Sequence, residues 1–286
     1  MPLVNLKKVL SESIEKKYAV GSFNAANYQG VEAILSASEE MNTPVILSIA
    51  EVHFRYLNLK YFIPYVKNRI AQCSVPVVLH LDHGLSFDTC IKAISMGFSS
   101  VMFDGSTLPI EKNIEITNKL VQIAHMANVS VEAEIGHVGG GEGNLEEGSE
   151  VDRSKFTKPE DAEIFVEKTD VDALAIAVGT VHGPYKGTPD IDNSLIKKIR
   201  NTISIPLVLH GGSGLSDDDF RNAVKSGINK VNFYTATSIA AVEKIKQIIN
   251  GPKKVSFPDL TKAATDVIKE IIKHQIEVFG TKPLKL

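Results

Sequence analysis

The chain has 286 residues, of which 43% are hydrophobic, and its 31 basic and 34 acidic side chains give a formal net charge of −3. This length suits a single α/β barrel domain, whereas two cysteines are too few for a disulfide scaffold and suit a reducing compartment. The sequence has no dense lysine and arginine block, no signal-peptide core and no segment of membrane-spanning length, which predicts a cytoplasmic protein with neither a nucleic-acid nor a membrane partner.

Apolar or β-branched runs recur along the chain, and most of the segments between them have helical periodicity. Several runs lack the alternation of a half-exposed strand and suit strands buried on both faces. The runs lie near residues 18–23, 44–49, 75–81, 99–103, 129–133, 173–178, 205–209 and 229–234. Eight such strands alternating with helices predict an α/β fold, a TIM (β/α)8 barrel that forms one domain over residues 1–286.

Extra helices are expected at both ends of this barrel. Leu6, Val9, Leu10 and Ile14 have helical apolar spacing, so the first segment is expected to cover the bottom of the barrel. Residues 257–279 form a second added helical region, whose apolar side chains either pack on the barrel or on a partner subunit.

The segment from Gly136 to Pro159 interrupts the strand and helix pattern. It begins with a glycine-rich run and continues with a polar stretch much longer than an ordinary loop of about 2–6 residues between a strand and a helix. We interpret it as a mobile active-site loop, and a disordered linker is the alternative.

Three histidines fall at equivalent places, each just past an apolar run and each followed by glycine: His83, His182 and His210. One histidine after a strand is usually a hydrogen-bonded structural residue, but three at matching places predict a shared metal. Three imidazoles leave a zinc coordination position open for substrate, and cobalt or manganese can also occupy such a site. The other histidines considered are given structural roles: His53, His80, His125 and His274.

Further polar residues follow the predicted strands. The carboxyl ends of barrel strands meet at one face, where catalytic groups of this fold gather. Asp82 adjoins His83, where a carboxylate beside a Lewis acid can donate or accept a proton. The remaining residues of this kind are Asn24, Asp104, Glu134, Asn232 and Thr235.

Two segments suggest a phosphate site. Residues 211–216 lead from the seventh run into a helix and offer backbone amides and a hydroxyl, and residues 232–237 follow the eighth run. The loops after strands 7 and 8 often bind phosphate in this fold. A plain tight turn is the alternative for either segment alone.

Taken together, these motifs resemble the zinc-dependent class II ketose-bisphosphate aldolases, which include fructose-1,6-bisphosphate and tagatose-1,6-bisphosphate aldolases. The resemblance spans nearly the whole chain. It is carried by His80-Leu81-Asp82-His83-Gly84 and by residues 132–142, 179–187, 209–214 and 230–232.

The resemblance implies a role for each site residue. Zinc on His83, His182 and His210 would bind dihydroxyacetone phosphate, whose carbon-bound proton Glu142 would exchange. Asp82 would transfer a proton to or from the oxygen of the aldehyde half, and Glu134 and Asp104 would support the metal or an alternate metal position. The substrate and its phosphate would contact Asn24, Gly183, Gly211, Gly212, Ser213, Asn232, Tyr234 and Thr235, with a monovalent cation (Na⁺ or K⁺) beside them.

The resemblance also implies a homodimer or homotetramer that acts on a small sugar phosphate. Two residues near the expected substrate differ from the family: Tyr234 stands where a small or acidic residue is common, and Ala50 where many relatives have serine. Alternative functions are an aldolase for another phosphorylated keto sugar or keto acid, and a sugar-phosphate-binding barrel without catalysis.

Overall fold

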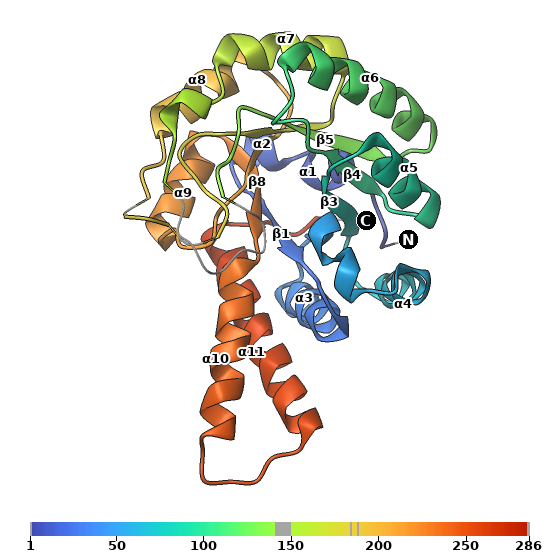
Figure 1. Ribbon diagram of the computed structural model, residues 1–286, viewed down its shortest axis with the longest axis vertical. Coiled ribbons are helices and arrows are strands. Elements are labelled where there is room, and N and C mark those ends of the chain that lie inside the picture. The colour runs from blue at the N-terminus through green and yellow to red at the C-terminus, as the bar shows by residue number, and fades with distance from the viewer. Residues whose placement is uncertain (1, 141–149, 184, 188, 285–286) are drawn as a thin grey trace.

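Eight parallel strands close into a barrel in the computed structural model, which describes residues 2–140, 150–183, 185–187 and 189–284 (Figure 1). Each strand pairs with its neighbours in chain order, and the last strand pairs with the first. Each overlaps the apolar run predicted for it, so the predicted TIM barrel is confirmed. The strands are β1 (Val20–Asn24), β2 (Val45–Ala50), β3 (Val77–Gly84), β4 (Ser100–Phe103), β5 (Ser130–Ile135), β6 (Ala173–Ile176), β7 (Leu207–Leu209) and β8 (Ile228–Phe233).

Helices surround this barrel and carry the chain from each strand to the next (Figure 1). Local sequence signals fix where they begin: the Asn27 side chain accepts a hydrogen bond from the amide of Gly30, and Ser216 and Asp219 form a reciprocal capping box. The outer helices are α3 (Tyr28–Met41), α4 (Leu59–Ala71), α5 (Phe87–Met96), α6 (Ile110–Met126), α7 (Pro159–Thr169), α8 (Asn193–Thr202) and α9 (Asp217–Ser226), with two 3₁₀ turns, η1 (Glu51–Tyr56) and η2 (Arg153–Lys155).

Two short helices precede the barrel, α1 (Leu6–Leu10) and α2 (Ser13–Lys16). Apolar side chains of α1 are buried against the lower interior of the barrel, where they meet Val20, Ile46 and Val78. The segment with helical spacing at the start of the chain therefore closes the bottom of the barrel, as predicted. This plug excludes water from the amino-terminal end of the barrel interior.

Above the apolar plug, the barrel interior has a polar layer. The hydroxyls of Ser22 and Ser48 lie 2.6 Å apart, and the His80 Nδ1 lies 2.9 Å from the Ser100 hydroxyl. The members of this layer are fully buried: Ser22, Ser48, His80, Ser100, Glu132 and Lys230. Since buried polar groups need hydrogen-bond partners, this layer forms a fixed base beneath the mouth of the barrel.

The C-terminal region adds a helical hairpin, which we call the arm: α10 (Thr235–Ile249) and α11 (Phe257–Val278). Figure 1 shows the arm projecting away from the barrel, with α11 returning toward it. The end of α11 packs on the barrel through Ile272 and Ile276, so part of the second added helical region is buried there. Within the described ranges, no helix is both long and apolar enough to cross a membrane.

Candidate metal centre and substrate site

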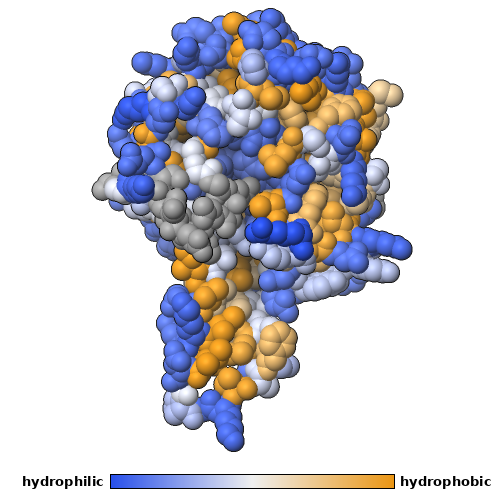
Figure 2. Space-filling model, in the orientation of Figure 1, coloured by the Kyte–Doolittle hydropathy of each residue, from blue (hydrophilic) through white to orange (hydrophobic). Residues whose placement is uncertain are grey.

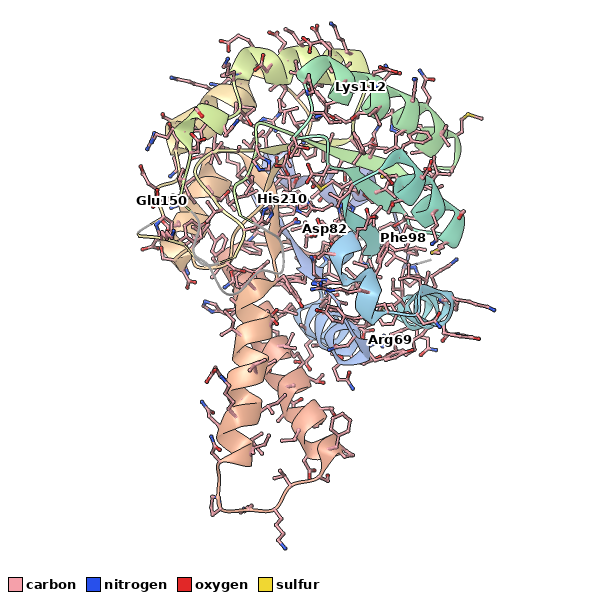
Figure 3. All side chains as sticks on the ribbon, viewed as in Figure 1. Arg69, Asp82, Phe98, Lys112, Glu150 and His210 are labelled. Carbon is pink, nitrogen blue, oxygen red and sulfur yellow. The ribbon has the colours of Figure 1, made fainter. Side chains whose placement is uncertain are left out.

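Asp82 and His83 are consecutive residues of β3, yet both take part in interactions at the mouth of the barrel. Neighbouring side chains of a regular strand point to opposite faces. Here the backbone of His83 is left-handed (φ 46°), and the pairing of β3 with β4 shifts register between Leu81 and Gly84. This irregularity allows the two side chains to face the same space. Figure 3 shows Asp82 and His210 at the mouth.

The three histidines predicted to bind metal lie together at the mouth of the barrel: His83 in β3, His182 six residues after β6, and His210 directly after β7. The ring centroid of His83 is 4.9 Å from that of His182 and 4.6 Å from that of His210. Each ring offers one nitrogen, and these nitrogens lie within 4.8 Å of one another. The structure thus brings His83 and His210, which are 127 positions apart in the chain, into contact.

Hydrogen bonds orient two of these rings toward a common point. His83 Nδ1 lies 2.8 Å from Asp104 Oδ2, and His210 Nε2 lies 3.0 Å from Glu132 Oε1. A carboxylate oxygen accepts a hydrogen bond from each of these nitrogens, which leaves His83 Nε2 and His210 Nδ1 with lone pairs that face each other at 2.9 Å. Two lone pairs at that distance repel unless a cation lies beside them.

His182 supplies the third nitrogen. Its Nε2 atom is buried and has no hydrogen-bond partner among the described residues. Burial lowers the pKa of both His182 and His210, and neighbouring imidazoles add to this effect. These two rings are therefore neutral at physiological pH, which is the state that binds a metal. An unpartnered nitrogen and two facing lone pairs fit a divalent cation.

A buried ion pair lies directly beneath the histidines. Lys230 Nζ lies 2.8 Å from Glu132 Oε2 and 2.8 Å from Asn232 Oδ1. Burial raises the pKa of Glu132, but the charge of Lys230 and the hydrogen bond from His210 outweigh it and bring the pKa to about 2. Glu132 therefore stays ionised and holds the His210 ring in one orientation. Sequence reasoning assigned no role to Lys230, because its partner comes from another strand.

Asp82 is held by two amides beside the histidines. Its Oδ2 accepts from Asn24 Nδ2 and its Oδ1 from Asn232 Nδ2, both at 2.8 Å. Burial disfavours the charged form, but His83 and His210 nearby lower the pKa of Asp82 well below its usual value. A fully buried carboxylate fixed in this way can exchange a proton with a group bound next to the metal position.

Glu134 and Asp104 form a second group with His83, whose ligand atoms also lie within 4.8 Å of one another. Burial raises the pKa of Glu134 to about 8, and the adjacent charge of Asp104 adds to the shift. Burial opposes ionisation of Asp104 as well, but hydrogen bonds from His83 and Ser106 lower its pKa well below the usual range. The predicted supporting carboxylates thus lie where an alternate metal position would be.

All eight residues predicted to contact the substrate or its phosphate line one pocket beside the histidines. The pocket is formed by the loop after β7, the end of β8 and the start of α10, where the N-cap residue Tyr234 gives no side-chain cap. Backbone amides at the start of a helix favour an anion. The residues are Asn24, Gly183, Gly211, Gly212, Ser213, Asn232, Tyr234 and Thr235, together with His182 and Phe233.

Gly211 shows why glycine follows His210. Its φ is +68°, and a Cβ atom there would lie 2.4 Å from the carbonyl oxygen of Val181. Only glycine permits the loop after β7 to approach the segment that carries His182 this closely. The ring of Tyr185 also reaches this loop, since its hydroxyl donates to the Gly211 carbonyl at 2.7 Å.

The predicted proton-exchange residue Glu142 lies outside the described residues, as does part of the segment interpreted as a mobile loop. Its described start lies beside the metal ligands, because the amide of His182 donates to the carbonyl of Gly139 at 2.7 Å. A short parallel bridge joins Gly139 to Val181. The chain therefore leaves β5 toward the mouth of the barrel before residue 141.

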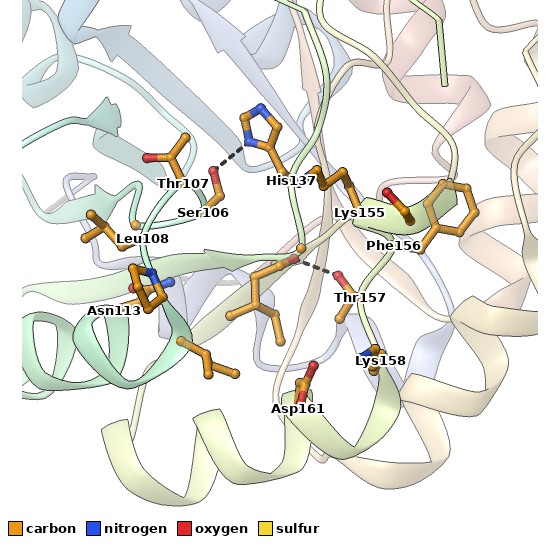
Figure 4. Close-up of a pocket in the computed structure, with 16 residues that line it drawn as sticks. Ser106, Thr107, Leu108, Asn113, His137, Lys155, Phe156, Thr157, Lys158 and Asp161 are labelled. Atoms are coloured by element: carbon orange, nitrogen blue, oxygen red, sulfur yellow. Dashed lines mark hydrogen bonds between the residues drawn. The ribbon is translucent and has the colours of Figure 1, made fainter. Parts of the chain in front are cut away.

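A second cavity of about 550 Å³ lies next to the mouth, between the loop after β4 and the start of α7 (Figure 4). Figure 4 shows the hydrogen bond between Ser106 and His137 at its rim (3.0 Å). Lys155 and Lys158 also line it. Of the predicted site residues that the structure describes, none lines this cavity, whereas all eight predicted to contact the substrate line the pocket beside the histidines.

One residue near the mouth was given only a structural role from the sequence. His53, in η1, is 3% exposed, and its ring lies 4.7 Å from that of Tyr234. By contrast, His125 pairs with Asp172 and His274 with Asp217, away from the mouth. The signal for His53 was its position three residues after Ala50 at the end of β2, which alone does not identify a site.

A TIM barrel with three convergent histidines, a fixed carboxylate and a pocket for an anion defines a metal-dependent enzyme for a phosphorylated substrate. Residues 4–283 match the family described as class-II fructose-bisphosphate aldolase. The chain belongs to this family, and it is accordingly a class II aldolase, a carbon–carbon lyase whose substrates are sugar phosphates.

Similar proteins agree with this assignment. A fructose-bisphosphate aldolase of Staphylococcus epidermidis is 41% identical, with 98% of each chain covered. One from Geobacillus stearothermophilus is 39% identical with the same coverage. The crystal structure of the YdjI aldolase from Escherichia coli K12 has 31% identity and a TM-score of 0.87, with 98% of each chain covered.

Proposed function

We propose that the chain, acting as one domain over residues 1–286, catalyses reversible aldol cleavage of a ketose 1,6-bisphosphate. The products are dihydroxyacetone phosphate and glyceraldehyde 3-phosphate. Fructose 1,6-bisphosphate is the first candidate, because the family and its similar proteins bear that name. Tagatose 1,6-bisphosphate, which differs at one carbon, is the second. A cytoplasmic location stays a prediction.

The metal ligands in this proposal are His83, His182 and His210, and zinc is the first candidate because it favours neutral imidazoles. When bound, such an ion polarises the ketose carbonyl and supplies the electrophile that a lysine Schiff base supplies in other aldolases. Asp104 and Glu132 keep the rings oriented by accepting their second N–H groups. Glu134 is the proposed ligand for an alternate metal position.

Asp82 is the proposed acid and base for the aldehyde half. In cleavage it accepts the hydroxyl proton next to the carbon–carbon bond, and in condensation it returns that proton to the aldehyde oxygen. Asn24 and Asn232 keep both of its oxygens in place without neutralising them. Glu142 is proposed to exchange the proton on the carbon of dihydroxyacetone phosphate.

The phosphate of dihydroxyacetone phosphate is proposed to bind at the start of α10. Thr235 is the first residue of this helix, and the Ser213 hydroxyl accepts a hydrogen bond from the amide of Ala236 at 3.3 Å. Gly211 and Gly212 allow the backbone to come close to the ligand. A monovalent cation, sodium or potassium, is proposed beside the phosphate to offset its second charge.

The arm is the proposed contact between subunits in a homodimer or homotetramer. Figure 2 shows apolar side chains along the arm, where a monomer would expose them to water. Phe257 is 76% exposed and Val242 is 48% exposed. Three further apolar residues of this region are also exposed: Ile239, Ile249 and Val255.

The observation that carries the proposal is the pair of facing imidazole nitrogens beside the fixed carboxylate Asp82. The test is release of dihydroxyacetone phosphate from fructose and tagatose 1,6-bisphosphates before chelation, after chelation and after zinc is restored. We expect release that chelation abolishes and zinc restores, and the ratio between the two sugars assigns the substrate. Binding without release by metal-loaded protein would contradict an aldolase and favour a sugar-phosphate sensor.

A further inference from the structure

Two aromatic rings meet above the end of β1. Tyr234 follows β8 and His53 lies in the turn after β2, and these two strands flank β1 in the barrel. Their ring centroids are 4.7 Å apart with planes at 56°. The pair therefore bridges the mouth of the barrel on the side of Asn24, which is the last residue of β1.

The backbone of Tyr234 is fixed where β8 turns into α10. Its carbonyl accepts hydrogen bonds from the Thr237 hydroxyl at 2.6 Å and from the amide of Ser238 at 3.1 Å. Tyr234 lines the same pocket as Asn24 and Asn232, the two residues that hold Asp82. Tyr234 is thus part of the pocket wall next to the Asp82 carboxylate, and it is not one of the proposed metal ligands.

His53 supports this wall from behind. The residue is almost fully buried, so its ring cannot turn away from Tyr234 without displacing neighbours. Its Nδ1 atom is buried and has no hydrogen-bond partner within the described part of the chain. An unpaired buried nitrogen destabilises a fold. The His53 ring packs against Tyr234 and, at 6.5 Å between centroids, lies near the Tyr56 ring in the same turn.

The wall lies on the aldehyde side of Asp82. Ala50, the last residue of β2, is the register partner of Asp82, so the turn that carries His53 begins beside this carboxylate. In the function proposed above, the phosphate of dihydroxyacetone phosphate lies in the part of this pocket formed by Gly211 and Ser213 after β7, whereas the ring of Tyr234 packs on His53 after β2. What remains next to Asp82 is the half of the ketose that leaves as aldehyde.

We propose that Tyr234, held in place by His53, determines which aldehyde the enzyme accepts by hydrogen bonding to the hydroxyl next to the aldehyde carbon. Tyr234 is the residue that touches substrate, and His53 is a positioning residue. This inference rests on the aldolase function proposed above. Among the described residues that line the two pockets at the histidines, none is lysine or arginine, so the recognised group is a hydroxyl rather than a charge.

The test measures condensation of dihydroxyacetone phosphate with glyceraldehyde 3-phosphate and with its 2-deoxy analogue, which lacks the recognised hydroxyl. The readout is kcat/KM for glyceraldehyde 3-phosphate divided by kcat/KM for the 2-deoxy analogue, measured for each variant. This ratio cancels changes in folding and metal content. In Tyr234→Phe the ratio should fall about tenfold, because one hydrogen bond to the hydroxyl is lost. A ratio equal to that of the unaltered enzyme would overturn the proposal.

Two substitutions at His53 separate positioning from general stability. His53→Ala removes the supporting ring and should lower the ratio, mainly through a higher KM for glyceraldehyde 3-phosphate. His53→Phe keeps a ring against Tyr234 and removes the unpaired nitrogen, so it should restore the ratio to within about threefold of the unaltered enzyme. A ratio as low in His53→Phe as in His53→Ala would show that ring packing is not the role of His53.

Proton exchange at the carbon of dihydroxyacetone phosphate distinguishes this proposal from the function on which it rests. If the unaltered, metal-loaded enzyme neither exchanges this proton nor forms a ketose, the aldolase function itself fails. If it does both, and Tyr234→Phe leaves the ratio unchanged, only the role of Tyr234 fails.

Discussion

His83 Nε2 and His210 Nδ1 face each other at 2.9 Å, and the other nitrogen of each ring is hydrogen-bonded to a carboxylate. The Asn232 amide also lies 3.3 Å from His210 Nδ1, which suits a nitrogen without a proton. The fold therefore concentrates unshared electron pairs at one buried point. Such an arrangement is unfavourable for the protein alone and becomes favourable when a cation binds.

Metal removal should consequently destabilise the folded protein as well as stop the reaction. Binding to the native state alone raises stability by about 4 kcal/mol at a metal concentration of about 1,000 times Kd. We expect a lower Tm after chelation and recovery with zinc, measured by calorimetry. A Tm that is the same with and without metal would contradict binding by these histidines.

Glu132→Gln should weaken metal binding by about 10- to 100-fold, because the residue that orients His210 loses its charge. It should also destabilise the fold by about 3–5 kcal/mol, since Lys230 would remain as an unpaired buried charge. Metal titration and denaturant unfolding measure the two effects. Lys262→Met, which removes the exposed pair with Asp266, is the control and should change neither.

Asp82→Ala should abolish turnover while the protein still binds metal and dihydroxyacetone phosphate. The loss in kcat should be about 10²- to 10⁴-fold, the usual contribution of a positioned acid or base. Neither Asn24 nor Asn232 can replace the carboxylate, because an amide side chain acts neither as an acid nor as a base at neutral pH. Turnover at the normal rate in this variant would exclude Asp82 from proton transfer.

The sequence allowed much of the barrel to be predicted, for a physical reason. Strands buried on both faces require continuous apolar runs, and each run lies within a few residues of the strand that forms there. His182 and His210 were recognisable because glycine follows each, and Gly211 shows the close approach that requires it. These signals are local, so they can be read from the chain.

The remaining parts of the site depend on contacts across the barrel. Lys230 and Glu132 lie 98 residues apart, and nothing near either residue indicates that they pair. His53 resembles any histidine in a turn until β8, β1 and β2 are placed side by side. The left-handed backbone of His83 is equally hidden, because only a few per cent of residues other than glycine adopt this conformation and no neighbouring residue marks it.

Gly211→Ala should destabilise the protein and impair phosphate binding. The added Cβ would collide with the Val181 carbonyl, which also lies next to a metal ligand. Gly187→Ala is a matched control, since Gly187 also has a positive φ (+91°) but nothing within 4 Å of its Cβ position. We expect the unfolding free energy to fall by about 1 kcal/mol in the control and by more in Gly211→Ala, with a raised KM only in the latter. Equal effects would mean that backbone strain, not the close approach, explains the glycine.

Substitutions on the arm should change the assembly without altering the barrel. Val242 and Phe257 are exposed apolar residues of α10 and α11, and a subunit contact would remove them from water. Light scattering should give an oligomer for the unaltered protein and a smaller mass at micromolar concentration for the double variant Val242→Lys, Phe257→Ser. Met126 on α6 is 90% exposed but lies on the barrel, so Met126→Lys should leave the mass unchanged. If the unaltered protein is a monomer, there is no assembly for the arm to form. If Met126→Lys lowers the mass as much as the double variant does, the assembly depends on general surface hydrophobicity and the arm is not the specific contact.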